Sequence, residues 1–129
     1  MSYYISRTVT LPFAEAVQRV VEELQNEGFG VLTEIDVKAT LKKKLGVDFR
    51  SYRILGACNP PFAYQALQAE RMIGTMLPCN VIVQEAEGGG SEVAAIDPVV
   101  SMQSVGNPAL AGLAEQVRSK LRRVVERVD

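Results

Sequence analysis

Residues 79–97 read CNVIVQEAEGGGSEVAAID, and this stretch decides the fold. Residues 79–85 and 92–97 are short segments rich in β-branched side chains, a pattern that is typical of strands. Gly88-Gly89-Gly90 between them indicates a hairpin turn. The two strands are therefore expected to be antiparallel neighbours in a sheet.

Further strands and helices are expected on both sides of this hairpin. Alternating or β-branched patterns predict strands at residues 3–10, 29–35 and 48–58, and cap residues or prolines predict helices that begin near Pro12, Asp36, Asn59 and Asn107. The resulting order, β-α-β-(α)-β-(α)-β-β-α, predicts an α+β fold with a mainly antiparallel five-stranded sheet and helices packed on one face. At 129 residues, we expect one domain over residues 1–129.

The composition excludes several classes of function. The absence of histidine excludes Ser-His-Asp and Cys-His catalysis and histidine metal sites. A net charge of −1 gives no overall basic character for nucleic-acid binding, and no apolar run is long enough for a bilayer. No phosphate-binding loop is present, so we expect no cofactor, no nucleic-acid partner and no membrane partner. Because no export signal is seen, we expect a cytoplasmic protein with two reduced cysteines.

Two Cys-Asn pairs beside proline suggest where a site lies. Cys58-Asn59 ends one predicted strand and Cys79-Asn80 begins the next, so antiparallel pairing would bring Cys58 close to Cys79. Asp97 ends the last strand at the same edge. The predicted cluster therefore contains Cys58, Asn59, Cys79, Asn80 and Asp97. Two thiols beside a carboxylate could bind a soft metal ion, and a thiol before a helix could be a nucleophile. Free cysteines are also frequently buried as small apolar residues.

Two charged patterns have both functional and structural interpretations. Glu34 and Asp36 share one strand face and could bind a cation or act as acid and base. Asp36 is more simply a helix cap, whereas for Glu34 a functional role and that of a solvated strand residue both stay open. Four lysines follow on one short helix, and they could meet a phosphate or an acidic partner or form a solvated face. They are Lys38, Lys42, Lys43 and Lys44.

The same residues carry a resemblance to a known family. Residues 28–37 (GFGVLTEIDV), 54–61 (ILGACNPP), 77–81 (LPCNV) and 95–98 (AIDP) resemble the motifs of the prokaryotic domain of unknown function number 302. Met76, before the third motif, is a mild departure from the family pattern. The resemblance implies a β-α-β(4)-α fold similar to that of the TATA-binding protein. It implies no activity, but it places Glu34, Asp36 and the predicted cluster inside family motifs.

Three hypotheses for function follow, in this order. The first is a non-catalytic module that binds a small molecule or a soft metal ion near the two Cys-Asn strand ends, with Glu34, Asp36 and the predicted cluster as its candidate residues. The second is a homodimeric interaction or assembly domain that pairs through exposed sheet edges. The third is a thiol-dependent enzyme with Cys58 or Cys79 as nucleophile and Glu34 or Asp97 as acid and base.

Overall fold

A computed structural model describes residues 2–129 and contains one five-stranded antiparallel sheet. The strands are β1 (Tyr4–Val9), β2 (Gly30–Asp36), β3 (Tyr52–Cys58), β4 (Cys79–Glu85) and β5 (Ser91–Ile96). Their order across the sheet is β1-β5-β4-β3-β2, and every neighbouring pair is antiparallel. The predicted α+β fold is therefore confirmed, including the hairpin between β4 and β5.

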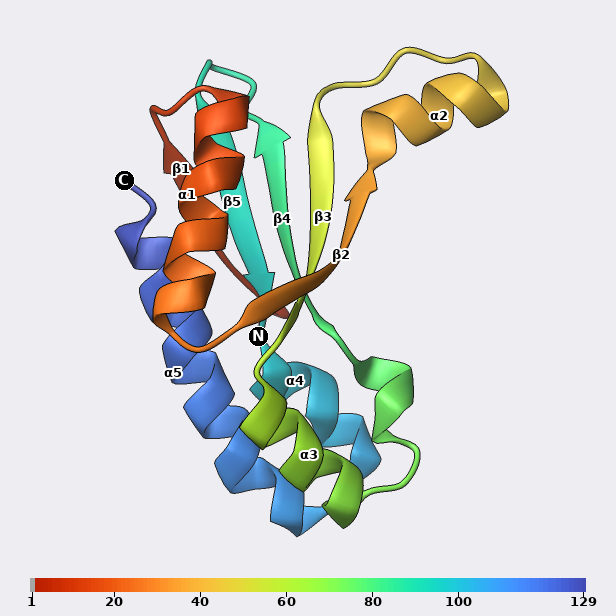
Figure 1. Ribbon diagram of the computed structural model, residues 1–129, viewed down its shortest axis with the longest axis vertical. Helices are drawn as coiled ribbons and strands as arrows, with labels where there is room; N and C mark the ends of the chain where they lie inside the picture. Colours follow the sequence, from red (N-terminus) through yellow and green to blue (C-terminus); the bar gives the residue numbers. More distant parts are fainter. Residues whose placement is uncertain (1) are drawn as a thin grey trace.

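Two helices cover one face of the sheet and form the main core (Figure 1). They are α1 (Phe13–Asn26) and α5 (Ala111–Arg127). Leu24 of α1 and Leu121 of α5 are fully buried against inward-facing strand residues such as Leu55 and Val81. Each such side chain contributes about 1.5–3 kcal/mol through its burial. This packing holds the sheet and both helices as one unit.

A second group of short helices lies beyond the strand ends (Figure 1). It consists of α3 (Pro60–Ala69), α4 (Pro98–Met102) and single 3-10 turns at Ile73–Met76, Gln103–Val105 and Pro108–Leu110. A smaller core of Ala66, Ile73 and Leu110 holds this group together. Helix α5 runs from this group up along the sheet, so it belongs to both cores. The space between the two cores is where a cavity forms.

The remaining helix, α2 (Val37–Leu45), projects from the body of the protein as an arm (Figure 1). Asp36 caps it as predicted, because its Oδ1 accepts a hydrogen bond of 2.9 Å from the backbone N–H of Ala39. Gly46 ends it in the left-handed conformation, with φ of 67°. None of the side chains of α2 is buried. The arm is thus well specified locally, and it contacts β2 and β3 while Val37, Thr40 and Leu41 are half-buried.

The connection between β5 and the last helix differs from the prediction. Asp97-Pro98 starts the short helix α4, which was not predicted, although an aspartate before proline is the same start signal as Asn59-Pro60. Asn107 does act as a cap, since its side chain accepts from the N–H of Ala109 at 3.0 Å. The turn that it starts is a 3-10 turn, and α5 itself begins only at Ala111. Five residues are too few to show helical periodicity, which is why α4 has no signal beyond its cap.

The helices α1 and α5 do not cover the opposite face of the sheet. Tyr4 and Asn80 are exposed on it, Tyr52 and Ile82 are half-buried, and together they line a hollow of about 350 Å³.

Within residues 2–129, no helix is both long and apolar enough to cross a membrane.

Candidate ligand-binding cavity

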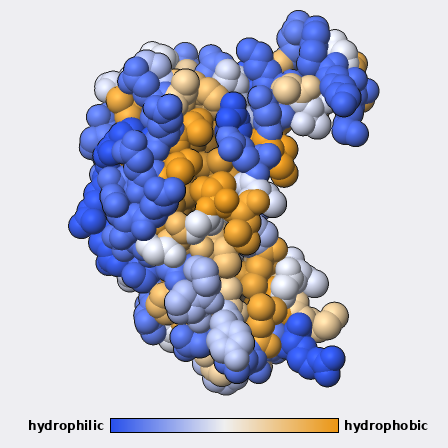
Figure 2. Space-filling view, viewed as in Figure 1, coloured by the Kyte–Doolittle hydropathy of each residue, from blue (hydrophilic) through white to orange (hydrophobic). Residues whose placement is uncertain are grey.

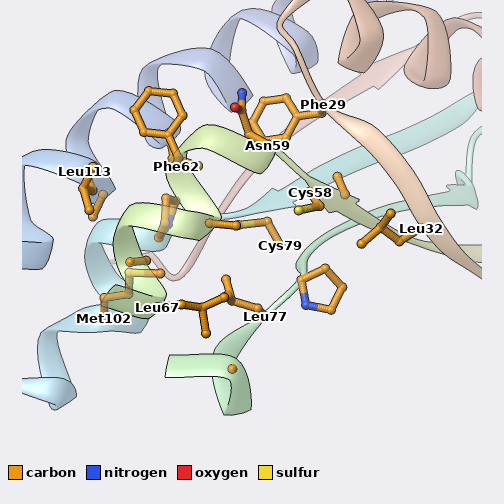
Figure 3. Close-up of a pocket in the computed structure, with 18 residues that line it drawn as sticks. Phe29, Leu32, Cys58, Asn59, Phe62, Leu67, Leu77, Cys79, Met102 and Leu113 are labelled. Atoms are coloured by element: carbon orange, nitrogen blue, oxygen red, sulfur yellow. The ribbon is translucent and has the colours of Figure 1, made fainter. Parts of the chain in front are cut away.

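A cavity of about 340 Å³ lies between the strand ends and the helices beyond them (Figure 3). One wall comes from α3 and another from α5, while residues in or next to β2, β3, β4, α4 and the 3-10 turn Ile73–Met76 supply the rest. None of the lining residues is charged. They are Phe29, Leu32, Ala57, Cys58, Asn59, Phe62, Ala63, Ala66, Leu67, Gly74, Leu77, Pro78, Cys79, Pro98, Met102, Leu113, Ala114 and Val117.

Proline-containing turns put these walls in place. At the end of β3, Asn59-Pro60 stops the strand and starts α3 without a linker. Pro78 leads into β4 and Pro98 opens α4, so both prolines stand at the same edge of the sheet and line the cavity. Strands therefore turn into helices at this edge without long loops. The apolar side chains of α3, among them Phe62 and Leu67, form a wall of the cavity.

A β-bulge in β2 shapes the mouth of the cavity. Val31 pairs with Ala57 and Thr33 pairs with Gly56, so Leu32 is the extra residue on the bulged strand. Its side chain is 68% exposed and lines the cavity at the solvent side. Leu67 of α3 is 45% exposed and also lines the cavity. Two large apolar side chains therefore flank an opening to solvent.

The two cysteines meet at this cavity, as predicted. Strands β3 and β4 are antiparallel neighbours, and Ala57, next to Cys58, pairs with Cys79. Both are free thiols that line the cavity, with Cys58 half-buried and Cys79 buried. Burial, and then the neighbouring Cys58, raises the pKa of Cys79 to about 11. At neutral pH Cys79 is a protonated thiol, which suits an apolar wall and not a nucleophile.

Asn59 has a different local role from the one predicted. It occupies the cap position of α3, but its side chain makes no capping hydrogen bond. Instead, Nδ2 donates to the backbone carbonyl of Glu27 at 3.2 Å. Gly28 follows with φ of 85°, and a Cβ there would lie 3.3 Å from Nδ2 of Asn59. Asn59 is 8% exposed, and its hydrogen bond links the turn after α1 to the end of β3, beside the cavity.

Asp97 is close in the fold but has structural partners. It is 5% exposed, and its Oδ1 accepts from the N–H of Val99 at 3.0 Å. Both carboxylate oxygens also accept from Nε of Arg118, at 3.1 and 3.2 Å. Asp97 thus caps α4 and links it to α5, and Pro98 and Val117 beside the pair line the cavity.

Three of the predicted site residues do not join the cysteines. Asn80 points to the open face of the sheet, because successive side chains of a strand alternate. Glu34 and Asp36 lie at the other end of β2, where Asp36 pairs with Arg53 in the register. Gly30 at the near end pairs with Cys58, whereas Glu34 pairs with Leu55. At about 3.3 Å per residue, Glu34 is therefore about 10 Å and Asp36 about 17 Å further along the strands.

Arg53 neutralises the two acidic residues. It forms ion pairs with Glu34 and, at 3.7 Å, with Asp36, which also caps α2. The pair is therefore engaged in structural contacts. Across residues 2–129, no three acidic or cysteine side chains come together in a way that could hold a metal ion.

Gly56 is needed for the close packing beside the cavity, which leads to a testable prediction. A Cβ at this position would lie 2.1 Å from Oγ1 of Thr33 and 2.8 Å from Cγ of Pro78. Replacing Gly56 by alanine should therefore lower the free energy of unfolding by about 1–3 kcal/mol, as overpacking does. Urea unfolding followed by circular dichroism measures this. Gly112→Ala is the matched control, because nothing lies within 4 Å there and alanine favours the α5 helix. Equal stability of the two variants would contradict the prediction.

Comparison with known proteins gives two findings. The profile of the family described as "Domain of unknown function DUF302" matches residues 5–128. A solved structure described as an uncharacterized conserved DUF302 protein from Bacillus stearothermophilus is similar over 100% of both chains, with 28% sequence identity and a TM-score of 0.93. No curated protein is similar to the chain in sequence. The resemblance predicted from the Cys-Asn motifs is thereby confirmed.

Proposed function

The chain belongs to the DUF302 family, and from its own geometry we propose that it binds a small, uncharged and mainly apolar molecule in the cavity between α3, α5 and the strand ends. The observation that carries this proposal is a wall of eighteen residues without a single charge, open to solvent between Leu32 and Leu67. A volume of 340 Å³ lies within the range of about 300–1,000 Å³ that is typical of ligand pockets.

The polar groups at the wall indicate the kind of ligand. Only Asn59, Cys58 and Cys79 bring polar side-chain atoms to it. The raised pKa of Cys79 keeps that thiol neutral, and the carboxylate of Asp97, which precedes the lining residue Pro98, is paired with Arg118. A charged ligand would lose its hydration without gaining a counter-ion here. An apolar molecule would gain about 25 cal/mol for each Å² of apolar surface removed from water.

The cavity favours this ligand over the soft metal ion that was the other form of the first hypothesis. A soft metal site would require further ligands beyond two thiols, and apart from Asn59 the other side chains that line the cavity are apolar. Asn59 and the two cysteines remain candidate contacts in the proposed site. Asp97 does not contact the cavity but holds α4 against α5 through its hydrogen bond with Arg118.

A dye titration with a cavity-filling variant tests the proposal. Nile red, a neutral apolar fluorophore, should bind the wild-type protein at one site with a saturating rise in emission. Ala63→Phe places a ring in the cavity and should weaken binding by about tenfold or more, equivalent to about 1.4 kcal/mol. The matched control is Ala14→Phe on the exposed side of α1, away from the cavity wall, which should bind as the wild type does.

Both variants are first checked for an unchanged circular dichroism spectrum, so that loss of binding is not loss of folding. Equal dye affinity in the Ala63 variant and the wild type would show that the dye binds elsewhere. That outcome, or an absence of saturable binding, would reject the cavity as the ligand site.

A further inference from the structure

The sheet face that α1 and α5 leave uncovered has a hollow of its own, of about 350 Å³, which we call the sheet hollow. Elsewhere, hydrophilic residues cover much of α1 and α5, and hydrophobic residues gather between the arm and the helices beyond the strand ends (Figure 2). The sheet hollow differs from both regions because aromatic, small and polar side chains line it together. It shares no lining residue with the apolar cavity, so a molecule bound here would occupy a second site.

The register of three strands gives the sheet hollow its floor. Ile82 of β4, Ala94 of β5 and Ser6 of β1 stand side by side across the sheet, and all three line the hollow. Alanine and serine have short side chains, so the surface is lowest along this line. The floor is therefore flat and mainly apolar, and a planar ring can lie on it.

Two tyrosines stand at one end of this floor. Tyr4 pairs with Ile96, which lies two residues beyond Ala94 on β5. The ring centroids of Tyr3 and Tyr4 are 5.0 Å apart at an angle of 73°, which is edge-to-face packing. Both side chains still present ring surface to solvent, since Tyr3 is 64% and Tyr4 45% exposed. The aromatic ring of a ligand would extend this packing.

Glu92 brings a negative charge to the other end of the floor. It lies four residues before Ile96 on β5, which is about 13 Å at the rise of a strand. Its half-buried carboxylate accepts a hydrogen bond of 2.9 Å from Nε2 of Gln84. Arg50 donates to Oε1 of the same Gln84 at 2.8 Å but does not line the hollow. Among the described residues that do line it, Glu92 alone is charged, so the hollow has no cation of its own.

We propose that the sheet hollow binds an aromatic amine, with the ammonium group at Glu92 and the ring against Tyr3 and Tyr4. The carboxylate favours a cation, because it has acceptor positions beyond the one that Gln84 occupies. The apolar floor and the tyrosines favour a flat ring over a small hydrated ion. The distance of about 13 Å between the two ends accommodates a ring and an ammonium group joined by a short chain. This site is separate from the proposed cavity site, and either can fail without the other.

Tryptamine is the probe, because it is an aromatic amine and the chain contains no tryptophan. Its indole can be excited at wavelengths where the four tyrosines do not absorb. The fluorescence anisotropy of tryptamine should therefore rise to saturation as protein is added. Tryptophol has the same ring but a neutral hydroxyl, and it should bind about tenfold more weakly because it forms no charge-assisted hydrogen bond with Glu92. Indole-3-acetate, an anion, should bind more weakly still. No saturable binding of tryptamine, or equal affinity for all three molecules, would overturn the proposal.

Variants of the floor and of the carboxylate locate the site. Glu92→Gln keeps an acceptor for Gln84 but removes the charge, so it should weaken tryptamine binding about tenfold. Ala94→Leu raises the floor and should also weaken binding. The matched control is Glu15→Gln, which removes an exposed glutamate from α1 on the covered side of the sheet and should bind as the wild type does. Unchanged affinity in the Glu92 variant would overturn the proposal.

A crossed comparison separates the sheet hollow from the apolar cavity. Ala63→Phe fills the cavity and should leave tryptamine binding unchanged, whereas Ala94→Leu should leave Nile red binding unchanged. Tryptamine binding that is lost in Ala63→Phe but kept in Ala94→Leu would place the amine in the cavity and overturn the proposal. Each variant is compared with the wild type by circular dichroism first, so that a loss of binding is not a loss of folding.

Discussion

Cys79 should react with iodoacetamide at pH 7 about a hundredfold more slowly than an unburied cysteine. Burial first, and then the Cys58 thiol, raises its pKa from 9.0 to about 11. Only the thiolate attacks the reagent, and each unit by which the pKa rises lowers the thiolate fraction about tenfold at neutral pH. With 9% of its surface exposed, Cys79 is also shielded from the reagent.

The Cys58→Ala variant isolates this reaction, and mass spectrometry measures its rate against pH. In this variant the contribution of Cys58 is gone and burial alone raises the pKa, so the rate should still rise about tenfold for each pH unit beyond the ordinary thiol pKa and level off below about pH 11. The same protein in guanidinium should level off near the ordinary thiol pKa. Fast labelling of the folded protein at pH 7 would contradict the assignment. It would also revive the hypothesis of a thiol-dependent enzyme with Cys79 as nucleophile.

Replacing Arg118 by methionine should lower the free energy of unfolding by about 3 kcal/mol. The change removes the guanidinium that donates to both oxygens of Asp97 and leaves a carboxylate that is only 5% exposed without its counter-charge. Breaking a buried ion pair from one side costs about 3–5 kcal/mol, and the 25% exposure of the Arg118 side chain sets the expectation at the lower end. Urea unfolding measures the loss.

The double variant Asp97→Asn/Arg118→Met separates lost charge pairing from lost packing. Asparagine can still cap α4 but carries no charge, so the double variant should recover part of the stability that the single one loses. Lys42→Met, which removes an exposed pair with Asp48, should cost less than about 1 kcal/mol. An Arg118 variant no less stable than the Lys42 variant would show that the buried pair has no stabilising role.

The features that follow from local rules were predictable from the sequence. The hairpin at Gly88-Gly89-Gly90 and the caps at Asp36 and Asn107 each depend on a few neighbouring residues, and all are present. The approach of Cys58 to Cys79 required only one correct strand pairing.

The features that depend on distant contacts were not predictable in this way. Asn59 is a residue type that often caps helices, but its side-chain amide donates to the backbone carbonyl of Glu27 in the turn after α1. Asn80 shares a motif with Cys79 yet lies on the opposite face, because motif proximity does not override strand alternation. Glu34 is separated from the cysteines because β2 runs antiparallel to β3, so that residues later in β2 lie further from Cys58. The predicted length of the strand already indicated that Glu34 lies several residues from that end. Apolar lining residues such as Phe29 and Met102 carry no chemical signal and emerge only from the packing.

Because Leu32 is the bulged residue of β2, the side chain at the cavity mouth can change without a change in the sheet. As the extra residue of β2, Leu32 has no partner of its own in the register with β3, and most of its side chain is in solvent. Substitutions there leave the strand pairing intact and cost little stability. Single changes at this position can therefore alter the size and polarity of the cavity entrance while the fold around it stays the same.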